Sequence, residues 1–152
     1  MLYPFVLQTK GNTNMKKRIL SLLLILCLAL TLCACGKEKT PDLWADALYT
    51  EDTELGQGAK TVTVQVTAEE KTVTFTINTD CATLGEALME HGLVEGEVGE
   101  FGLYVKKVNG ITADYDVDQT YWGFYSGGEY MMTGVDVTEI LGGESYELVR
   151  TK

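Results

Sequence analysis

The sequence predicts an α+β domain in which one short helix packs on a mostly antiparallel β-sheet. Three observations predict this class. Branched apolar residues alternate with polar residues over 61–67 and 72–77, Thr83 and Glu86 have the spacing of a helix-capping pair, and glycine-containing turns separate the later strands. Consecutive strands with a single helix favour an α+β arrangement, with the helix on one face of the sheet.

The first two strands are predicted from their alternation. Val62, Val64 and Val66 would point to one side of the strand, and the residues between them are threonine and glutamine. The polar break at 68–71 separates this strand from the next, so we expect a β-hairpin with one buried face and one face in water.

The predicted helix begins after Thr83. A capping box with Glu86 would satisfy two free backbone N–H groups, and Gly92 stands where a left-handed residue ends a helix. The apolar stripe consists of Leu84, Ala87 and Leu88. A helix of about two turns depends on packing for its stability. We expect residues 95–99, rich in Glu and Gly, to form a loop.

The later strands are predicted from their turns. Residues 103–108 are expected to end at a tight turn at Asn109-Gly110, and residues 121–126 and 129–132 flank Gly127-Gly128. In that register Tyr125 would face Tyr130, and Phe124 would face Met131. Asp136 and Glu139 suggest a brief capped turn, and residues 145–151 form the closing strand.

The N-terminal region resembles a bacterial lipoprotein signal. Basic residues 16–18 precede an apolar run over 19–34, and Leu32-Cys33-Ala34-Cys35 resembles a lipobox. The resemblance implies that Cys35 is lipidated and becomes the first residue after residues 1–34 are removed. A transmembrane helix is the alternative, but a run of 16 residues is shorter than the ~20 that a bilayer requires. Residues 1–14 match nothing in such a signal, and we interpret them as a start-site extension before Met15.

Three segments follow from this interpretation: a signal peptide at 1–34, a lipid-anchored tether at 35–60 and a folded domain at 61–152. Trp44 and Tyr49 are unusual in a spacer, and we expect them to dock on the domain; the membrane surface is the alternative. Residues 35–152 hold 8 basic and 22 acidic residues, a net charge of −14. This charge argues against nucleic acid as a partner and against attraction to anionic lipid headgroups.

Several candidate reactive sites fail on their spacing. Cys81 is the only thiol left after processing, and a small core residue is its simplest role. His91 is the only histidine in the sequence. A nucleophilic pair of His91 and Cys81 fails because the predicted helix would hold the two side chains apart. We expect the His91 ring to be solvated near the helix C-terminus. Asp114, Asp116 and Asp118 imitate the start of a calcium loop, but the loop glycine and glutamate are missing. We expect them on the wet face of an edge strand, and we expect no metal site and no enzyme.

One family resemblance covers residues 61–152. Tyr121-Trp122 before a glycine-turn hairpin, Gly134-Val135, Gly143-Glu144 and Tyr146-Glu147-Leu148 resemble the C-terminal domain of transcobalamin and intrinsic factor, as do residues 104–110. The resemblance implies a β-grasp fold that binds a soluble ligand. The resemblance does not extend to the helical domain with which those vitamin carriers enclose the other side of cobalamin. Residues 35–152 are too few to include such a domain.

The resemblance also implies where a ligand would bind. Aromatic and methionine side chains on and beside the 121–132 hairpin would contact a flat corrin ring: Trp122, Phe124, Tyr125, Tyr130, Met131 and Met132. Because strands alternate, either Trp122 and Phe124 or Tyr121 and Tyr125 would instead belong to the core. We expect a lipid-anchored, extracytoplasmic binding module for a soluble ligand, with a corrinoid such as cobalamin as the leading candidate and a membrane transporter as a partner. The alternative is a cell-surface module that binds a protein or a glycan.

Overall fold

The computed structural model describes residues 42–152. The expected signal peptide, the lipidation site at Cys35 and the first part of the tether lie outside these residues. Within the described part, no helix has the length and apolar character needed to cross a bilayer.

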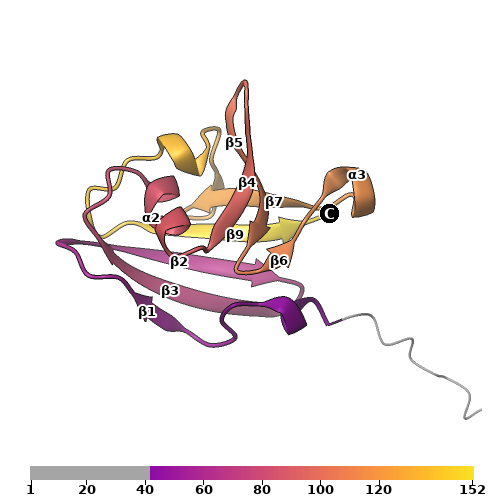
Figure 1. The fold of residues 1–152 in the computed structure, drawn as a ribbon, viewed down its shortest axis with the longest axis horizontal. Coiled ribbons are helices and arrows are strands. Elements are labelled where there is room, and N and C mark those ends of the chain that lie inside the picture. The colour runs from indigo at the N-terminus through magenta and orange to yellow at the C-terminus, as the bar shows by residue number, and fades with distance from the viewer. Residues whose placement is uncertain (1–41) are drawn as a thin grey trace, which may run out of the picture. The chain divides into compact units, whose positions relative to one another are not determined.

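A six-stranded mixed sheet forms the centre of the domain (Figure 1). Its strands, in spatial order, are β1 (Thr53–Leu55), β3 (Lys71–Thr79), β2 (Lys60–Ala68), β9 (Ser145–Thr151), β7 (Tyr121–Ser126) and β8 (Glu129–Tyr130). The pairs β1–β3 and β2–β9 are parallel, and the other pairs are antiparallel. The chain therefore brings its closing strand β9 between the first hairpin and the β7–β8 hairpin.

The β2–β3 hairpin matches the alternation in the sequence. Val62, Val64 and Val66 are fully buried on its inner face, as are Phe75 and Ile77 of β3. The threonines and Gln65 between the buried positions lie on the other face, which is half-buried or exposed. The hairpin prediction is confirmed, with each strand extended by one or two residues at each end.

The helix α2 (Leu84–Glu90) has the predicted capping box. The hydroxyl of Thr83 accepts from the N–H of Glu86, and the Glu86 carboxylate accepts from the N–H of Thr83. The N–H of Leu84 donates to the carbonyl of Thr138, and a Cβ at Gly85 would lie 2.7 Å from the Cα of Asp136. Glycine at 85 thus allows α2 to pack closely on η2 (Val135–Val137).

A second sheet contains β4 (Val94–Gly99), β5 (Gly102–Val108) and β6 (Ile111–Thr112). The loop expected at 95–99 is wrong, because these residues pair with β5 along the whole of β4. The pairing is made by backbone groups and by exposed cross-strand ion pairs, Lys106–Glu97 and Lys107–Glu95, so it leaves no apolar alternation in the sequence. The β4–β5 hairpin projects from the body of the domain (Figure 1).

The acidic residues near 116 form a turn of helix rather than an edge strand. In α3 (Tyr115–Asp118), the Asp114 carboxylate caps the N-terminus by accepting from the N–H of Asp116. The Asp118 carboxylate accepts from the N–H of Thr120 and pairs with Arg150. The expected wet strand face is wrong because these carboxylates bind local backbone N–H groups, which favours a turn.

Residues 42–60, which the sequence assigned to the tether, include folded structure. Trp44, in η1 (Leu43–Asp46), is 7% exposed, and its Nε1 donates to the carbonyl of Ala68. The Asn109 side chain accepts from the N–H of Tyr49 and donates to the carbonyl of Tyr49. Further along, β1 pairs with β3. Trp44 and Tyr49 therefore dock on the domain.

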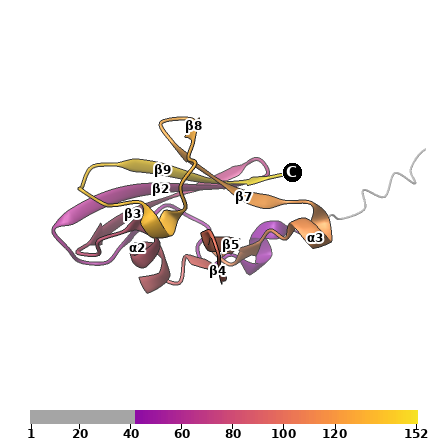
Figure 2. The same cartoon turned by 90° about the horizontal axis from the view of Figure 1, so that it is seen from above.

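The structure confirms the α+β class with mostly antiparallel strands. Figure 2 shows the six-stranded sheet from its edge, with α2, β4 and β5 on one side. The buried apolar residues of the inner sheet face meet those of α2 and of the second sheet in one core. The opposite face of the sheet carries mostly polar residues, so the domain has one covered face and one open face.

Candidate ligand-binding site

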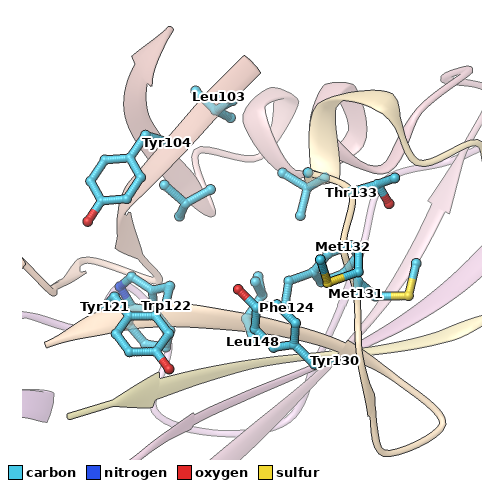
Figure 3. A pocket seen from close by; sticks show the side chains of 13 residues that line it. Leu103, Tyr104, Tyr121, Trp122, Phe124, Tyr130, Met131, Met132, Thr133 and Leu148 are labelled. Atoms are coloured by element: carbon cyan, nitrogen blue, oxygen red, sulfur yellow. The ribbon is translucent and has the colours of Figure 1, made fainter. Parts of the chain in front are cut away.

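A cavity of about 320 Å³ lies between β5 and β7, and we call it the β5–β7 cavity. Its walls are residues 103–105 of β5, Tyr121, Trp122 and Phe124 of β7, Leu148 of β9 and the segment 130–135. None of these residues is charged. Figure 3 shows Leu103 and Tyr104 across the cavity from Phe124 and Tyr130. The volume lies at the lower end of the range for small-molecule pockets, and the apolar and aromatic walls are typical of them.

Alternation along β7 places Trp122 and Phe124 on its buried face, beside the cavity. Trp122 and Phe124 are 8% and 7% exposed on the inner face, where Phe124 packs at 5.5 Å between ring centroids on Tyr146. Phe124 lies opposite Leu148 in the register with β9. These side chains are at once part of the core and part of the cavity wall.

The segment after β8 supplies the methionines. The N–H of Met131 donates to the carbonyl of Phe124 at 2.9 Å, so the chain stays beside β7 after the assigned strand ends at Tyr130. Met131 is half-buried, whereas Met132 is 91% exposed and Tyr130 is also exposed. Flexible methionine side chains at an opening can adapt to the shape of a ligand.

The β5 wall is fixed to η2 by Asp136. The Asp136 carboxylate accepts from the N–H of Leu103 at 3.1 Å. Gly102 has a φ of +102°, and a Cβ there would lie 2.6 Å from Oδ2 of Asp136. The expected capping role of Asp136 is wrong, because η2 has no side-chain cap and this carboxylate bonds to β5 instead.

The charged groups near the cavity are already paired. Lys106 of β5 lies 6.0 Å from the centroid of the Tyr104 ring, and its Nζ donates to Glu97 at 3.0 Å. This hydrogen bond raises the pKa of Lys106, together with attraction from the Glu97 and Asp114 carboxylates, although desolvation opposes the shift. The charge of Lys106 is therefore paired with the Glu97 carboxylate, and its side chain is not part of the cavity wall.

The structure brings together five of the six side chains that the sequence proposed for the ligand: Trp122, Phe124, Tyr130, Met131 and Met132. Tyr125 is not among the lining residues. Its ring covers Gly123, where a Cβ would lie 2.8 Å away, and meets the Tyr130 ring edge-on at 5.4 Å. The registers are confirmed for Tyr125 with Tyr130 and for Phe124 with Met131. Alternation alone does not exclude Tyr125, because Tyr121 shares its strand face and lines the cavity. The Tyr125 ring instead packs over Gly123 and against the Tyr130 ring.

Sequence reasoning missed the opposite wall at 103–105 and the residues 133–135. A signal for the β5 wall was present, because Tyr104 opens one of the stretches that carry the family resemblance. The contact between β5 and β7 depends on the position of the second sheet, which the sequence pattern alone did not specify.

The remaining candidates lie away from the cavity wall. Cys81 is half-buried, and its Sγ contacts Oε2 of Glu90 at 3.4 Å. His91 ends α2, but the expected solvated ring is wrong in part, because its Nε2 is buried near Gly56 without a hydrogen-bond partner. Among residues 42–152, no three His, Cys, Asp or Glu side chains form a group that could hold a metal ion.

Comparison with known proteins shows a solved structure that is similar to this chain in both sequence and fold. No protein-family model matches the chain, and no curated protein matches it significantly. A crystal structure from Ruminococcus gnavus ATCC 29149, described as a "putative metal binding protein", is 37% identical with a TM-score of 0.59. The match covers 62% of this chain and 98% of that one. The chain therefore belongs to the same family as this R. gnavus protein.

Haptocorrin in complex with cobinamide is a more distant structural match. It is 23% identical with a TM-score of 0.47, and the match covers 64% of this chain. The matched region spans only 26% of the haptocorrin chain.

Proposed function

We propose that this chain is a binding module for a soluble small molecule, which it holds in the β5–β7 cavity. The observation that carries the proposal is the cavity itself: about 320 Å³ in volume, without a charged lining residue, and open at Tyr130 and Met132. Aromatic and methionine surfaces favour a ligand with a broad apolar face. We propose binding without catalysis.

A corrinoid is the ligand that we propose to test first. Its support is the sequence resemblance to the cobalamin carriers over residues 121–148, which includes Trp122 and Phe124 of the cavity wall. A corrin ring is larger than the cavity, so it would rest on the wall and rim with one side uncovered. Such a complex suits a module that passes its ligand to another protein.

Calorimetric titration of the full-length chain in detergent with dicyanocobinamide and hydroxocobalamin tests this proposal. We expect saturable heat, and we expect Met132→Glu to weaken binding at least about tenfold because it places an unpaired charge at the opening. Leu141→Glu is the matched control, because Leu141 is also a large apolar residue exposed to solvent but does not line the cavity. Heat no greater than dilution at high micromolar ligand would remove the corrinoid proposal.

The name of the R. gnavus relative raises a metal ion as another ligand. The described residues offer a metal ion no cluster of three suitable side chains, and the possible ligand atoms in the cavity wall are Tyr and Thr hydroxyls, methionine sulfur and backbone groups. We therefore propose an organic ligand for this cavity.

A second candidate function, contact with a surface protein, is favoured by the β4–β5 hairpin. Phe101 at its tip is 97% exposed, and Val98 beside it is also largely exposed. Large apolar side chains at the end of a projecting hairpin are typical of an interaction site. Co-purification of one membrane protein with the wild-type chain, lost with Phe101→Glu and kept with Met132→Glu, would support this candidate.

We further propose that Cys35 carries a lipid and holds the domain at the extracytoplasmic face of the cell membrane, where a membrane transporter would receive the ligand. The lipobox-like sequence at residues 32–35 supports this proposal. Metabolic labelling with a fatty acid should label the wild-type chain and fail to label Cys35→Ser. Labelling that persists in Cys35→Ser would overturn it.

A further inference from the structure

The tight turn Asn109-Gly110 lies beneath the segment 42–49. The Asn109 side chain is fully buried; its Oδ1 accepts from the N–H of Tyr49 at 3.0 Å, and its Nδ2 donates to the carbonyl of Tyr49 at 2.8 Å. The backbone carbonyl of Asn109 accepts from the N–H of Leu48 at 3.0 Å. The segment 42–49 is therefore docked on the turn mainly through this asparagine.

The glycine of the turn lies against the same segment. A Cβ at Gly110 would collide with the carbonyl oxygen of Asp46 and would lie 3.3 Å from the Cα of Ala47. Towards its other end, the segment is held by Trp44, whose Nε1 donates to the carbonyl of Ala68 at 3.1 Å. The docked segment thus covers both residues of the Asn-Gly pair.

An asparagine followed by glycine can cyclise without an enzyme, because glycine has no side chain to hinder the reaction. The backbone nitrogen of Gly110 would lose its proton to water and attack Cγ of Asn109. The new bond from nitrogen to Cγ forms as the bond from Cγ to Nδ2 breaks, and Nδ2 leaves as ammonia. One water molecule then opens the resulting succinimide at either carbonyl, which leaves aspartate or isoaspartate at position 109.

We propose that Asn109 is a deamidation site that the docked segment 42–49 protects and that becomes reactive when the segment is released. In the docked state the attack on Cγ would break the planar amide that makes both bonds with Tyr49, and Asn109 has no surface open to water. Local opening of the segment removes both obstacles while the sheet stays folded. The proposal does not depend on the ligand of the β5–β7 cavity.

The reaction makes the release permanent. A carboxylate at position 109 has no N–H to donate, so one of its oxygens would face the carbonyl oxygen of Tyr49. Docking would also bury the charge of that carboxylate, which costs free energy. Isoaspartate in addition lengthens the backbone of the turn. The segment therefore docks reversibly while residue 109 is asparagine and stays released once it has been converted.

Peptide mass spectrometry of the full-length chain in detergent tests the protection. Trypsin separates Asn109 from Asn78, the other asparagine of residues 42–152, which serves as an internal control. In mildly alkaline buffer we expect Trp44→Ala to convert Asn109 at least about tenfold faster than the wild type, because its segment opens more often. The chain unfolded in urea gives the rate without protection.

Leu84→Ala is the matched control for Trp44→Ala. Leu84 is also buried in the core, but it belongs to α2 and its N–H bonds to Thr138. We expect this variant to convert Asn109 at close to the wild-type rate. Equal rates in the two variants would overturn the proposed protection, as would a folded wild type that converts as fast as the chain in urea or a Trp44→Ala chain that converts no faster than the wild type.

Asn109→Asp, which is one of the two products, tests the permanent release. Hydrogen exchange at the N–H groups of Leu48 and Tyr49 should become faster in this variant, while exchange in β9 does not change. Gln65→Glu adds the same charge at an exposed position of β2 and should leave the exchange at both residues unaltered. Exchange at Tyr49 as slow in Asn109→Asp as in the wild type would overturn the one-way release.

Discussion

The Asp136 carboxylate and the backbone N–H of Leu103 form a hydrogen bond of 3.1 Å that joins η2 to the first residues of β5. Leu103 and Val135, the neighbour of Asp136, both line the β5–β7 cavity. Gly102 permits this approach, because a side chain there would collide with the carboxylate. One bond between residues 33 positions apart therefore fixes the distance between two walls of the cavity.

Replacing Asp136 with alanine should loosen the β5 wall. We expect a loss of about 1.5 kcal/mol in the free energy of unfolding, because a charged acceptor is removed from a backbone N–H. Hydrogen exchange at Leu103 should become faster while exchange in β2 and β3 does not change. Asp116→Ala is the matched control, since Asp116 is exposed on α3. Unchanged exchange at Leu103 would contradict the role assigned to Asp136.

Trp44 tests whether the segment before β1 belongs to the folded domain. Because Trp44 is buried and bonded to Ala68, Trp44→Ala should lower the free energy of unfolding by about 3 kcal/mol. Trp44→Phe keeps most of the packing and should lower it by about 1 kcal/mol. Urea unfolding measures both. If Trp44→Ala is as stable as the wild type, the segment is a tether in solution.

Asn109 is fully buried, and its side chain makes two hydrogen bonds with the backbone of Tyr49. Its φ of 50° is left-handed, a conformation that asparagine tolerates better than alanine. Asn109→Ala should therefore lower the free energy of unfolding by about 2–3 kcal/mol. Gln65→Ala, at an exposed position of β2, should change it by less than about 0.5 kcal/mol. Equal effects of the two substitutions in thermal or urea unfolding would argue against the structural role of Asn109.

Asp118 should make part of the stability depend on pH. Its pKa is lowered first by the hydrogen bond from the Thr120 hydroxyl, with help from the Thr120 N–H and from Arg150, although desolvation opposes the shift. A carboxyl whose pKa is lower in the folded state stabilises the fold above its unfolded pKa, near 3.9, and this contribution is lost as the pH falls through the folded pKa.

We therefore expect Asp118→Asn to be less stable than the wild type at pH 7, by no more than about 1 kcal/mol because the carboxylate is partly in solvent. The difference should shrink as the pH falls below about 4. Urea unfolding across pH 2–7 measures this, with Glu100→Gln at an exposed position as the control. A difference between Asp118→Asn and the wild type that is constant over the whole pH range would contradict the prediction.

The sequence predicted those elements whose burial leaves a periodic pattern. The valines of β2 and the Thr83–Glu86 capping box each determine a local structure that the tertiary fold retains. It also placed Phe124 opposite Met131, because the Gly127-Gly128 turn sets the register of that hairpin. Local chemistry was sufficient in these cases.

The two elements that the sequence analysis predicted wrongly, β4 and α3, are stabilised by polar contacts and not by apolar packing. β4 has exposed residues from Glu95 onward and is held by backbone pairing, and α3 is held by carboxylates that cap N–H groups. Neither produces an apolar period. The Tyr125 error is different: Tyr121 shares its strand face and lines the cavity, so alternation did not decide the matter. Tyr125 is absent from the wall because its ring packs over Gly123 and against Tyr130, a contact that the sequence pattern does not specify.

The most direct test of the central claim, that the β5–β7 cavity is the ligand site, uses the methionine methyl signals. Met131 and Met132 line the cavity, whereas Met89 is an exposed residue of α2 outside the lining. With ¹³C-methyl methionine in the full-length chain, saturating dicyanocobinamide should shift the methyl signals of Met131 and Met132 and leave that of Met89 in place. Saturable binding that leaves both Met131 and Met132 unshifted would contradict the claim.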